Sequence, residues 1–382
     1  MSELTDSNEL APARELMQGF AERSGLANDS GDAARRYLWT DAFATLNFLA
    51  LSNLDGDKVF DAQALRTIKE VHCHLGQYAE QDSRAGWISG LEEEKGREHP
   101  TVGGLRIGKK RPERKEGEHY DQKLEWERDG QYYHYHTRWI NALLTASKHF
   151  NNKQLATWAA ELSIAGSRFI ADKEGAGTKM YWKMSVDLSR PLVPMMGAHD
   201  PLEGLLCAMQ AYAESGSFKY EFDGYIDKLK ALCARSHWAT DDALGVGSLL
   251  LNVVRAAELQ TFMELPPAVK PERLLRDAEQ GLDAIYRSFN ADESANYRLA
   301  FRECGLSLGL RCLKGNLALL KENAVEPQID SAIWQMADDI EAFWLAEKNQ
   351  QASTFQDHLD INEVSLAASL LAKEKPEIYT RI

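Results

Sequence analysis

The sequence has no apolar run of the roughly 18–20 residues that a membrane-spanning helix needs. Its start, MSELTDSNELAPAREL, is polar and acidic and lacks the apolar core of a secretory signal. The five cysteines are scattered and form no C-x-x-C pair, which is the pattern of reduced thiols rather than of a disulfide framework. Together these absences predict a cytoplasmic protein with no membrane partner.

Positive charge is also scarce. The 382 residues include 44 Lys and Arg against 58 Asp and Glu, which gives a formal net charge of −14. A chain with that balance is poorly suited to general nucleic-acid binding or to docking on anionic lipid. We therefore expect no nucleic-acid partner.

The short motifs of several enzyme classes are missing. The sequence has no GxSxG nucleophile elbow, no P-loop, and no GxGxxG that opens a helix after a strand. Its two H-x-H pairs are His72 with His74 and His134 with His136. On a helix, residues two apart diverge by roughly 200° and cannot share one ion. The sequence thus predicts neither a metal nor a cofactor.

Helical periodicity is what the sequence has in abundance. No pair of alternating apolar and polar runs is joined by a hairpin turn, so no β-hairpin is expected in the periodic segments. About twelve segments have the period of a helix: residues 8–24, 32–54, 61–81, 130–150, 153–172, 200–215, 220–236, 240–260, 271–289, 296–322, 328–347 and 360–373.

No Gly/Ser-rich or Pro-rich linker divides the chain, so residues 1–382 are expected to form a single domain. The long charged segment 84–129 is interpreted as an insertion over one rim, with a short hairpin near VGGLRIGKK. Gly305 and Gly309 lie four apart on one helix face, where small residues permit close helix approach. About twelve helices in sequential antiparallel pairs predict an all-α fold, the (α/α)6 toroid.

The helix number and the richness in aromatic residues resemble those of the six-hairpin glycosidase superfamily. That superfamily includes many glycoside hydrolases and the N-acylglucosamine 2-epimerase type of sugar isomerase. The segments YLWTDAFA, GWISGL, DGQYYHYHTRW and MYWKMSVDLSRPLVPMMGAHDPLEGL also resemble those of a set of uncharacterised bacterial proteins. The second resemblance covers most of the chain and implies no activity. The superfamily resemblance implies a carbohydrate substrate, although the paired-histidine pattern of the epimerases is not found.

Asp41 is the sharpest single candidate for catalysis. It lies in YLWTDAFATLNFLAL, an otherwise apolar helix. Burial of an unpaired carboxylate is costly and raises its pKa, which suits a general acid near neutral pH. The alternative is a buried ion pair with an arginine such as Arg35, Arg190 or Arg302.

The segment DGQYYHYHTRWINALL carries an aromatic stripe. A helix that starts near Gly130, with Asp129 as its cap, would point His134 away from that stripe. Tyr, His and Trp on one face suit the floor of a sugar cleft, and they suit a plain core equally well. The residues predicted to share the face are Asp129, Tyr132, His136, Trp139 and Leu143.

Residues 180–205, MYWKMSVDLSRPLVPMMGAHDPLEGL, end in a predicted helix start. Asp200 would be the N-cap and Glu203 the third residue of a capping box, with Pro201 between them. Capping does not explain Trp182 or the other polar residues before it, so we expect the body of this segment to face the same cavity as residues 129–139.

The leading hypothesis is a glycoside hydrolase that acts on a small carbohydrate or glycoside with two carboxyl groups. Asp41 is the predicted acid, and Asp129 or Asp200 the predicted base. One alternative is a sugar isomerase with His136 and His199 as proton carriers, and another is a helical binding or scaffold protein without catalysis. The residues predicted to bind sugar are Trp39, Tyr132, His136, Trp182, Arg190 and His199.

Overall fold

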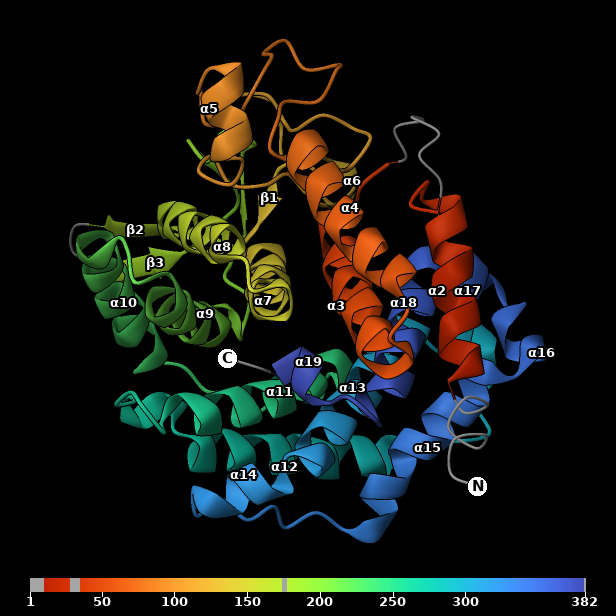
Figure 1. Ribbon diagram of the computed structural model, residues 1–382. Helices are drawn as coiled ribbons and strands as arrows, with labels where there is room; N and C mark the ends of the chain where they lie inside the picture. Colours follow the sequence, from red (N-terminus) through yellow and green to blue (C-terminus); the bar gives the residue numbers. More distant parts are fainter. Residues whose placement is uncertain (1–9, 28–34, 174–176, 381–382) are drawn as a thin grey trace. The chain divides into compact units, whose positions relative to one another are not determined.

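The computed structural model describes residues 10–27, 35–173 and 177–380 (Figure 1). By its internal contacts the chain divides into two compact units. The first unit comprises Met1–Asp32, Leu46–Gln63 and His237–Ile382, and the second comprises Ala33–Thr45 and Ala64–Ser236. Two helices, α3 (Leu38–Asp55) and α4 (Lys58–Leu75), contribute residues to both units.

The prediction of a helical protein is confirmed. Within the described ranges, twelve helices have seven residues or more. In the same ranges, every helix is too short or too polar to cross a lipid bilayer. Besides α3 and α4, the long helices are α2 (Ala11–Arg23), α7 (Tyr133–Phe150), α8 (Lys153–Gly166), α9 (Asp200–Ser215), α10 (Lys219–Cys233), α11 (Ala243–Leu259), α12 (Pro271–Ser288), α13 (Ala300–Gly315), α15 (Ser331–Leu345) and α18 (Leu359–Ala372). The short ones are α5 (Glu93–Glu98), α6 (Gln122–Glu127), α14 (Leu317–Glu322), α16 (Glu347–Gln350), α17 (Ser353–Gln356) and α19 (Glu377–Thr380).

Glycine sets the packing distance of two helices in the first unit. Helix α11 packs against α12 and α13, and α13 packs in turn against α15 and α18. A Cβ added at Gly247 would lie 2.1 Å from the carbonyl oxygen of Gly305, and one added at Gly309 would lie 2.5 Å from that of Gly247. The prediction that Gly305 and Gly309 permit close helix approach is therefore confirmed.

Segments from both ends of the chain meet inside the first unit. The side-chain amide of Asn47 donates to the carbonyl of Val364, 317 residues away, at 2.9 Å. The Tyr379 hydroxyl donates to Oδ1 of Asn47 at 2.8 Å across 332 residues. Helices α2 and α18 pack together, and Arg23 pairs with Asp360 at 3.1 Å. The first unit is thus assembled from parts far apart in sequence.

The second unit contains helices α7 to α10 and two small sheets. Helices α7, α8 and α9 pack against one another, and α10 packs on α9. Strands β2 (Ile170–Lys173) and β3 (Gly177–Met180) form an antiparallel hairpin. Strands β1 (Gln131–Tyr132), β4 (Lys183–Met184) and β5 (Pro191–Val193) form an antiparallel sheet in the order β1-β4-β5.

The β2–β3 hairpin corrects the expectation that the periodic segments contain no hairpin. Residues 170–172, predicted as the end of a helix, belong to β2 because α8 stops at Gly166 and a 3-10 turn follows. Each strand has only two to four residues, which is too short for alternation to stand out in the sequence. The β1–β4 pairing places the start of α7 beside residues 180–200.

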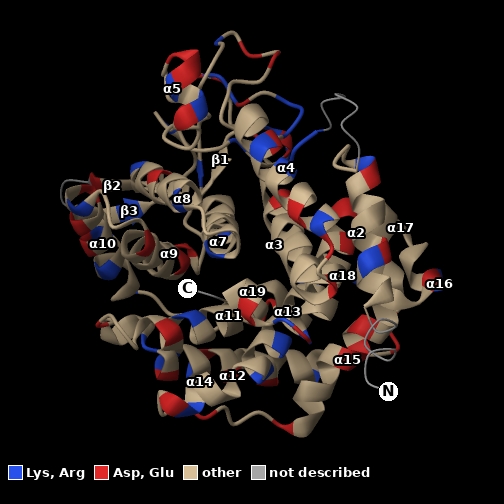
Figure 2. Cartoon of the chain, in the orientation of Figure 1, with Lys and Arg blue, Asp and Glu red and all other residues tan. Residues whose placement is uncertain are grey.

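The segment 84–129 contains α5 and α6, and the hairpin predicted near residues 102–110 is wrong because those residues form turns and bends instead. Positive φ values of 78° at Gly104 and 96° at Gly108 turn the chain there. Arg106 fastens the segment, since its guanidinium donates to the carbonyls of His74 and Gln77, each at 2.7 Å. On α5, basic and acidic residues are neighbours along the helix (Figure 2). Some of them form ion pairs, such as Lys95 with Glu98 at 2.6 Å.

Candidate functional site

Asp129 is buried at the end of the segment 84–129. Its Oδ2 accepts from Arg106 at 2.5 Å, and its Oδ1 accepts from the backbone N–H of Gly108 at 3.0 Å. The sequence predicted Asp129 as a helix cap, which is wrong because α7 begins at Tyr133 with Tyr132 in the N-cap position. Both oxygens of Asp129 are therefore used to hold the segment in place.

Asp41 is also buried and paired. Its Oδ1 lies 3.4 Å from Nη1 of Arg36, and both side chains are at most 3% exposed. Its Oδ2 accepts from the backbone N–H of Tyr37 at 2.9 Å, just before α3 begins. The ion-pair alternative of the sequence analysis thus has a partner that was not named: Arg36, one residue beyond Arg35.

Asp200 is a buried carboxyl group whose pKa lies in the range needed for proton transfer near neutral pH. Burial raises its pKa to about 7, and the neighbouring charge of Glu203 acts in the same direction. Its Oδ2 accepts from the backbone N–H of Gly197 at 3.1 Å. Asp200 is the first residue of α9, and His199 holds the N-cap position, so the predicted N-cap role of Asp200 is wrong. The carboxyl faces the chain before the helix.

Glu203, one turn further along α9, has a pKa that is shifted in the opposite direction. Burial acts to raise its pKa, but the Arg138 guanidinium, His199 and the Thr137 hydroxyl outweigh burial and lower it. Arg138 donates to its Oε1 at 2.6 Å and Thr137 to its Oε2 at 3.0 Å. Glu203 is thus bound to α7 and does not close a capping box. Two neighbouring carboxyl groups with pKa values pushed apart are typical of acid–base sites.

One face of α7 connects this carboxyl pair to a group of aromatic side chains. Thr137 and Arg138 hold Glu203, and His134 lies one turn before them on the same face. The ring nitrogen Nδ1 of His134 accepts from the indole N–H of Trp182 at 2.8 Å. Burial lowers the pKa of His134 to about 3, so the ring is neutral with its proton on Nε2.

The aromatic group consists of six rings from four segments. Trp126 and Trp182 lie edge to face with ring centroids 4.8 Å apart. Tyr132 lies 5.9 Å from Trp182 and 5.2 Å from His134. Trp126 is 40% exposed, so the group reaches the surface of its unit. Its members, called the aromatic group below, are Tyr37, Trp126, Tyr132, His134, Tyr135 and Trp182.

Two lysines flank Tyr132 at the base of the aromatic group. The ammonium groups of Lys109 and Lys183 each lie 5.5 Å from the centre of its ring. Burial and the charge of Lys183 lower the pKa of Lys109 to about 8. Lys183 is fully buried and donates to the carbonyl of Glu125 at 2.6 Å and to its carboxylate at 3.1 Å. The hydroxyl of Tyr132 is buried and has no hydrogen-bond partner among the described residues.

The structure separates the residues that the sequence grouped together. Tyr132 and Trp182 belong to the aromatic group, and His199 lies at the start of α9 beside Glu203. Arg190 donates to the carbonyl of Arg114 and lies half-buried. The adjacency predicted between residues 129–139 and 180–200 is present, because Trp182 bonds His134.

Trp39 and His136 lie in the core instead. Trp39 is 7% exposed, and its ring centroid lies 4.5 Å from that of Phe43. The Nε2 of His136 lies 3.2 Å from the carbonyl oxygen of Leu105, and its ring contacts Phe169. His134 and His136 exchanged their predicted roles because the helix starts at Tyr133 and residues 131–132 are extended.

The comparisons with known proteins identify the fold of this chain. No protein-family model matches the chain, and no curated protein matches its sequence. Among solved structures, the GH76A α-1,6-mannanase of Salegentibacter sp. HEL1_6 matches with a TM-score of 0.53 and 11% identity, over 97% of this chain and 100% of that one. The chain has the six-hairpin (α/α)6 toroid fold. The fold predicted from the sequence is confirmed.

Two further structures share this fold. An inactive variant of the same mannanase has asparagine in place of two consecutive aspartates and is in complex with α-1,6-mannotriose. It matches with a TM-score of 0.54 and 10% identity over 97% of this chain and 99% of that one. A sugar epimerase from a ruminal bacterium matches with a TM-score of 0.50 and 8% identity over 88% of this chain and 86% of its own. Hydrolases and epimerases thus share the fold, and identities this low carry no activity across.

Proposed function

We propose that this protein is a carbohydrate-active enzyme that hydrolyses a glycosidic bond, with Asp200 as its general acid. The observation that carries the proposal is the pair at the start of α9, where Asp200 has a pKa of about 7 and the pKa of Glu203 is lowered. A group that donates a proton near neutral pH must be protonated there, and a pKa of about 7 leaves a large share of Asp200 protonated at that pH. The fold, found in a mannanase and in a sugar epimerase, supports a carbohydrate as the substrate class.

In this proposal Asp200 gives its proton to the leaving oxygen as the glycosidic C–O bond breaks and positive charge develops on the sugar ring. A water molecule then adds to that ring carbon and gives a proton back to the Asp200 carboxylate. The negative charge of Glu203 keeps Asp200 protonated and stabilises the developing positive charge. The exposed ring of Trp126 and the half-buried ring of Trp182 are suited to pack on the C–H surfaces of a pyranose.

The sequence analysis gave the acid role to Asp41, and the structure leads us to move it. Both oxygens of Asp41 are engaged, one by Arg36 and the other by the Tyr37 amide. The base role of Asp129 stays a prediction, since its carboxylate is already bound by Arg106. The substitution Asp129→Asn tests it in the assay described below.

A second consideration supports the pair on α9. The inactive mannanase variant lacks two consecutive aspartates. This chain has two consecutive pairs, at 241–242 and 338–339. Asp242 caps α11 through Gly245 at 2.9 Å, and Asp338 pairs with Arg311 at 2.5 Å. One aspartate of each pair therefore makes a structural contact. We assign the acid–base chemistry instead to Asp200 and Glu203, which are three residues apart.

Sugar epimerisation is the second candidate. Both His134 and His199 lie near Glu203, so two imidazoles are close to one carboxylate. His134 is nevertheless a poor proton carrier, because its Nδ1 lone pair accepts from Trp182 and its pKa is about 3. The predicted carrier His136 is buried against Leu105. These contacts favour hydrolysis.

The test is a screen for turnover by the wild type and three variants, Asp200→Asn, Asp129→Asn and Glu214→Gln. Hydrolysis is measured on 4-nitrophenyl glycosides and epimerisation by NMR on reducing disaccharides. Asp200→Asn should lower hydrolysis by roughly 10²-fold or more. The control Glu214→Gln, which removes a charge paired with Lys148 near the end of α9, should leave hydrolysis unchanged. Wild-type hydrolysis should decline above about pH 7, where Asp200 loses its proton.

Other outcomes separate the alternatives. Full hydrolytic activity in Asp200→Asn would refute the acid role. Epimerisation without hydrolysis would support the second candidate. Saturable sugar binding with no turnover of any kind would support the non-catalytic binding protein.

A further inference from the structure

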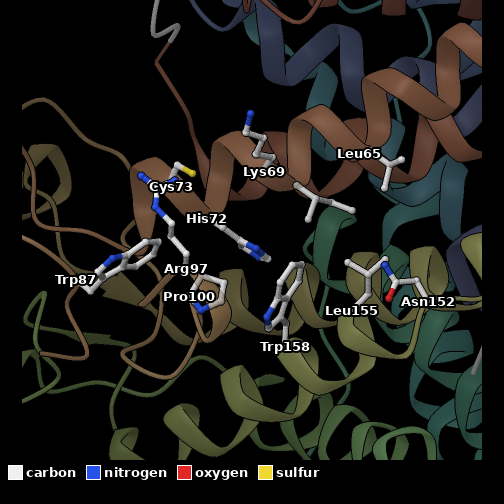
Figure 3. Close-up of a pocket in the computed structure, with 11 residues that line it drawn as sticks. Leu65, Lys69, His72, Cys73, Trp87, Arg97, Pro100, Asn152, Leu155 and Trp158 are labelled. Atoms are coloured by element: carbon white, nitrogen blue, oxygen red, sulfur yellow. The ribbon is translucent and has the colours of Figure 1, made fainter. Parts of the chain in front are cut away.

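The second unit contains a pocket that shares no lining residue with the site on α7 and α9. Its volume is about 280 Å³. That is close to the lower end of the range for small-molecule sites. It lies between the second half of α4, part of the segment 84–129, and the start of α8 (Figure 3). Its walls include His72, Trp87, Leu155 and Trp158.

The two tryptophan walls are fixed by hydrogen bonds at their edges. The indole N–H of Trp87 donates to the Glu93 carboxylate at 3.0 Å, and that of Trp158 donates to the Glu98 carbonyl at 2.8 Å. Trp87 also packs so closely on Gly96 that a Cβ there would lie 2.1 Å from its ring. With both N–H groups satisfied, the tryptophans offer the pocket only apolar surface.

His72 supplies one unsatisfied polar group. It is 4% exposed, and its Nε2 accepts from the indole N–H of Trp139 at 3.1 Å. Burial lowers the pKa of His72 to about 3, so the ring is neutral and its proton sits on Nδ1. Within the described residues, that N–H has no hydrogen-bond acceptor. The ring points toward Trp158 in Figure 3.

The charged side chains near the pocket do not favour an ionic ligand. Arg97 is already paired with Glu93 at 2.7 Å. Lys69 lies at the edge, and its ammonium group points away from His72 (Figure 3). Nδ1 of His72 is not among the fully buried polar atoms that lack a partner, and the residue lines the pocket, so an oxygen atom of a ligand there can accept its hydrogen bond.

We propose that this pocket binds a small, uncharged aromatic molecule whose carbonyl or other oxygen accepts a hydrogen bond from Nδ1 of His72. The apolar body would lie between Trp87, Trp158 and Leu155. The site is independent of the proposed glycosidase chemistry, so either proposal can fail without the other.

Acetophenone and cumene are the matched probes, since they are close in size and cumene lacks the carbonyl. Dissociation constants for both are measured by ligand-observed NMR on the wild type, Trp158→Ala and Cys73→Phe. Cys73 is a half-buried wall residue whose enlargement fills the pocket. Binding of both probes should weaken at least about tenfold in each variant, since each loses or fills the apolar volume.

The substitution His72→Phe keeps an aromatic ring at this position and removes the N–H donor. It should weaken acetophenone relative to cumene by about fivefold, the worth of one neutral hydrogen bond. A second measurement needs no variant: in 15N-histidine-labelled wild type, acetophenone should shift the Nδ1–H resonance of one of the ten histidines and cumene should not.

Three results would overturn the proposal. The first is acetophenone binding that is absent, or unchanged by both Trp158→Ala and Cys73→Phe. The second is benzoate binding that exceeds acetophenone binding and is lost in Lys69→Ala, which would mean an anionic ligand. The third is self-association that Leu65→Asp abolishes, which would mean that the exposed Leu65 and the pocket serve a second copy of the chain.

Discussion

Replacement of Asp200 by asparagine should change how the stability of this protein depends on pH. The ordinary pKa of this carboxyl is 3.8, and burial raises it to about 7 in the folded protein. The folded state therefore holds a proton that the unfolded state releases between these two pH values. Stability contributed by that proton is fully present below pH 3.8 and is lost as the pH rises to about 7.

The magnitude follows from the size of the shift. The difference between the two values, 7 − 3.8, is about 3 pH units, and each unit corresponds to about 1.4 kcal/mol. Wild type should thus lose about 4 kcal/mol of unfolding free energy relative to Asp200→Asn between pH 4 and pH 7, and little beyond. Asn has nearly the same shape, and its oxygen can still accept from Gly197.

The assay is urea unfolding of both proteins at unit steps from pH 4 to pH 8. The relevant quantity is the difference in unfolding free energy at each pH, because other titrating groups cancel in it. Glu214→Gln, on the same helix, should give no comparable trend. A difference between wild type and Asp200→Asn that stays flat from pH 4 to pH 8 would mean that Asp200 ionises normally. The reasoning about its burial, and with it the acid role, would then be wrong.

Two further predictions concern packing and pairing. Gly247→Ala should destabilise by several kcal/mol, because its Cβ would lie 2.1 Å from the carbonyl of Gly305. Gly224→Ala, in α10 with open space around it, should be neutral or stabilise by up to about 1 kcal/mol, so equal effects in thermal unfolding would contradict the account. Asp41→Asn should cost about 3–5 kcal/mol by leaving Arg36 without its charge partner. If it instead removes activity at unchanged stability, Asp41 regains the acid role.

The sequence predicted the helices because their signal repeats over many turns. In the predicted helix 296–322, Gly305 and Gly309 marked the contact that α13 makes with α11. Strands β1 and β4 could not be found in the same way. Each has two residues, and their pairing is set by neighbours some fifty residues away along the chain.

The candidate site was predicted in part, and its errors have one physical origin. Helix-face geometry depends on where the helix starts, and residues 131–132 are extended because they pair with β4. A start near Gly130 placed His136 on the site face and His134 away from it. The sequence singled out Asp200, but the interpretation as a helix cap gave no reason to expect its raised pKa. Only the fold shows that Glu203 is held by Arg138, a partner 65 residues away.

The link between Asn47, Val364 and Tyr379 has a consequence for the order of events during synthesis. Every residue of the second unit has been synthesised once Ser236 has been added. The first unit must wait, because Asn47 finds its acceptor at Val364 and its donor at Tyr379. Helix α2, though made first, likewise packs on α18, which is made near the end. Its apolar face therefore stays without its partner for most of the time that translation takes, while the second unit is free to fold.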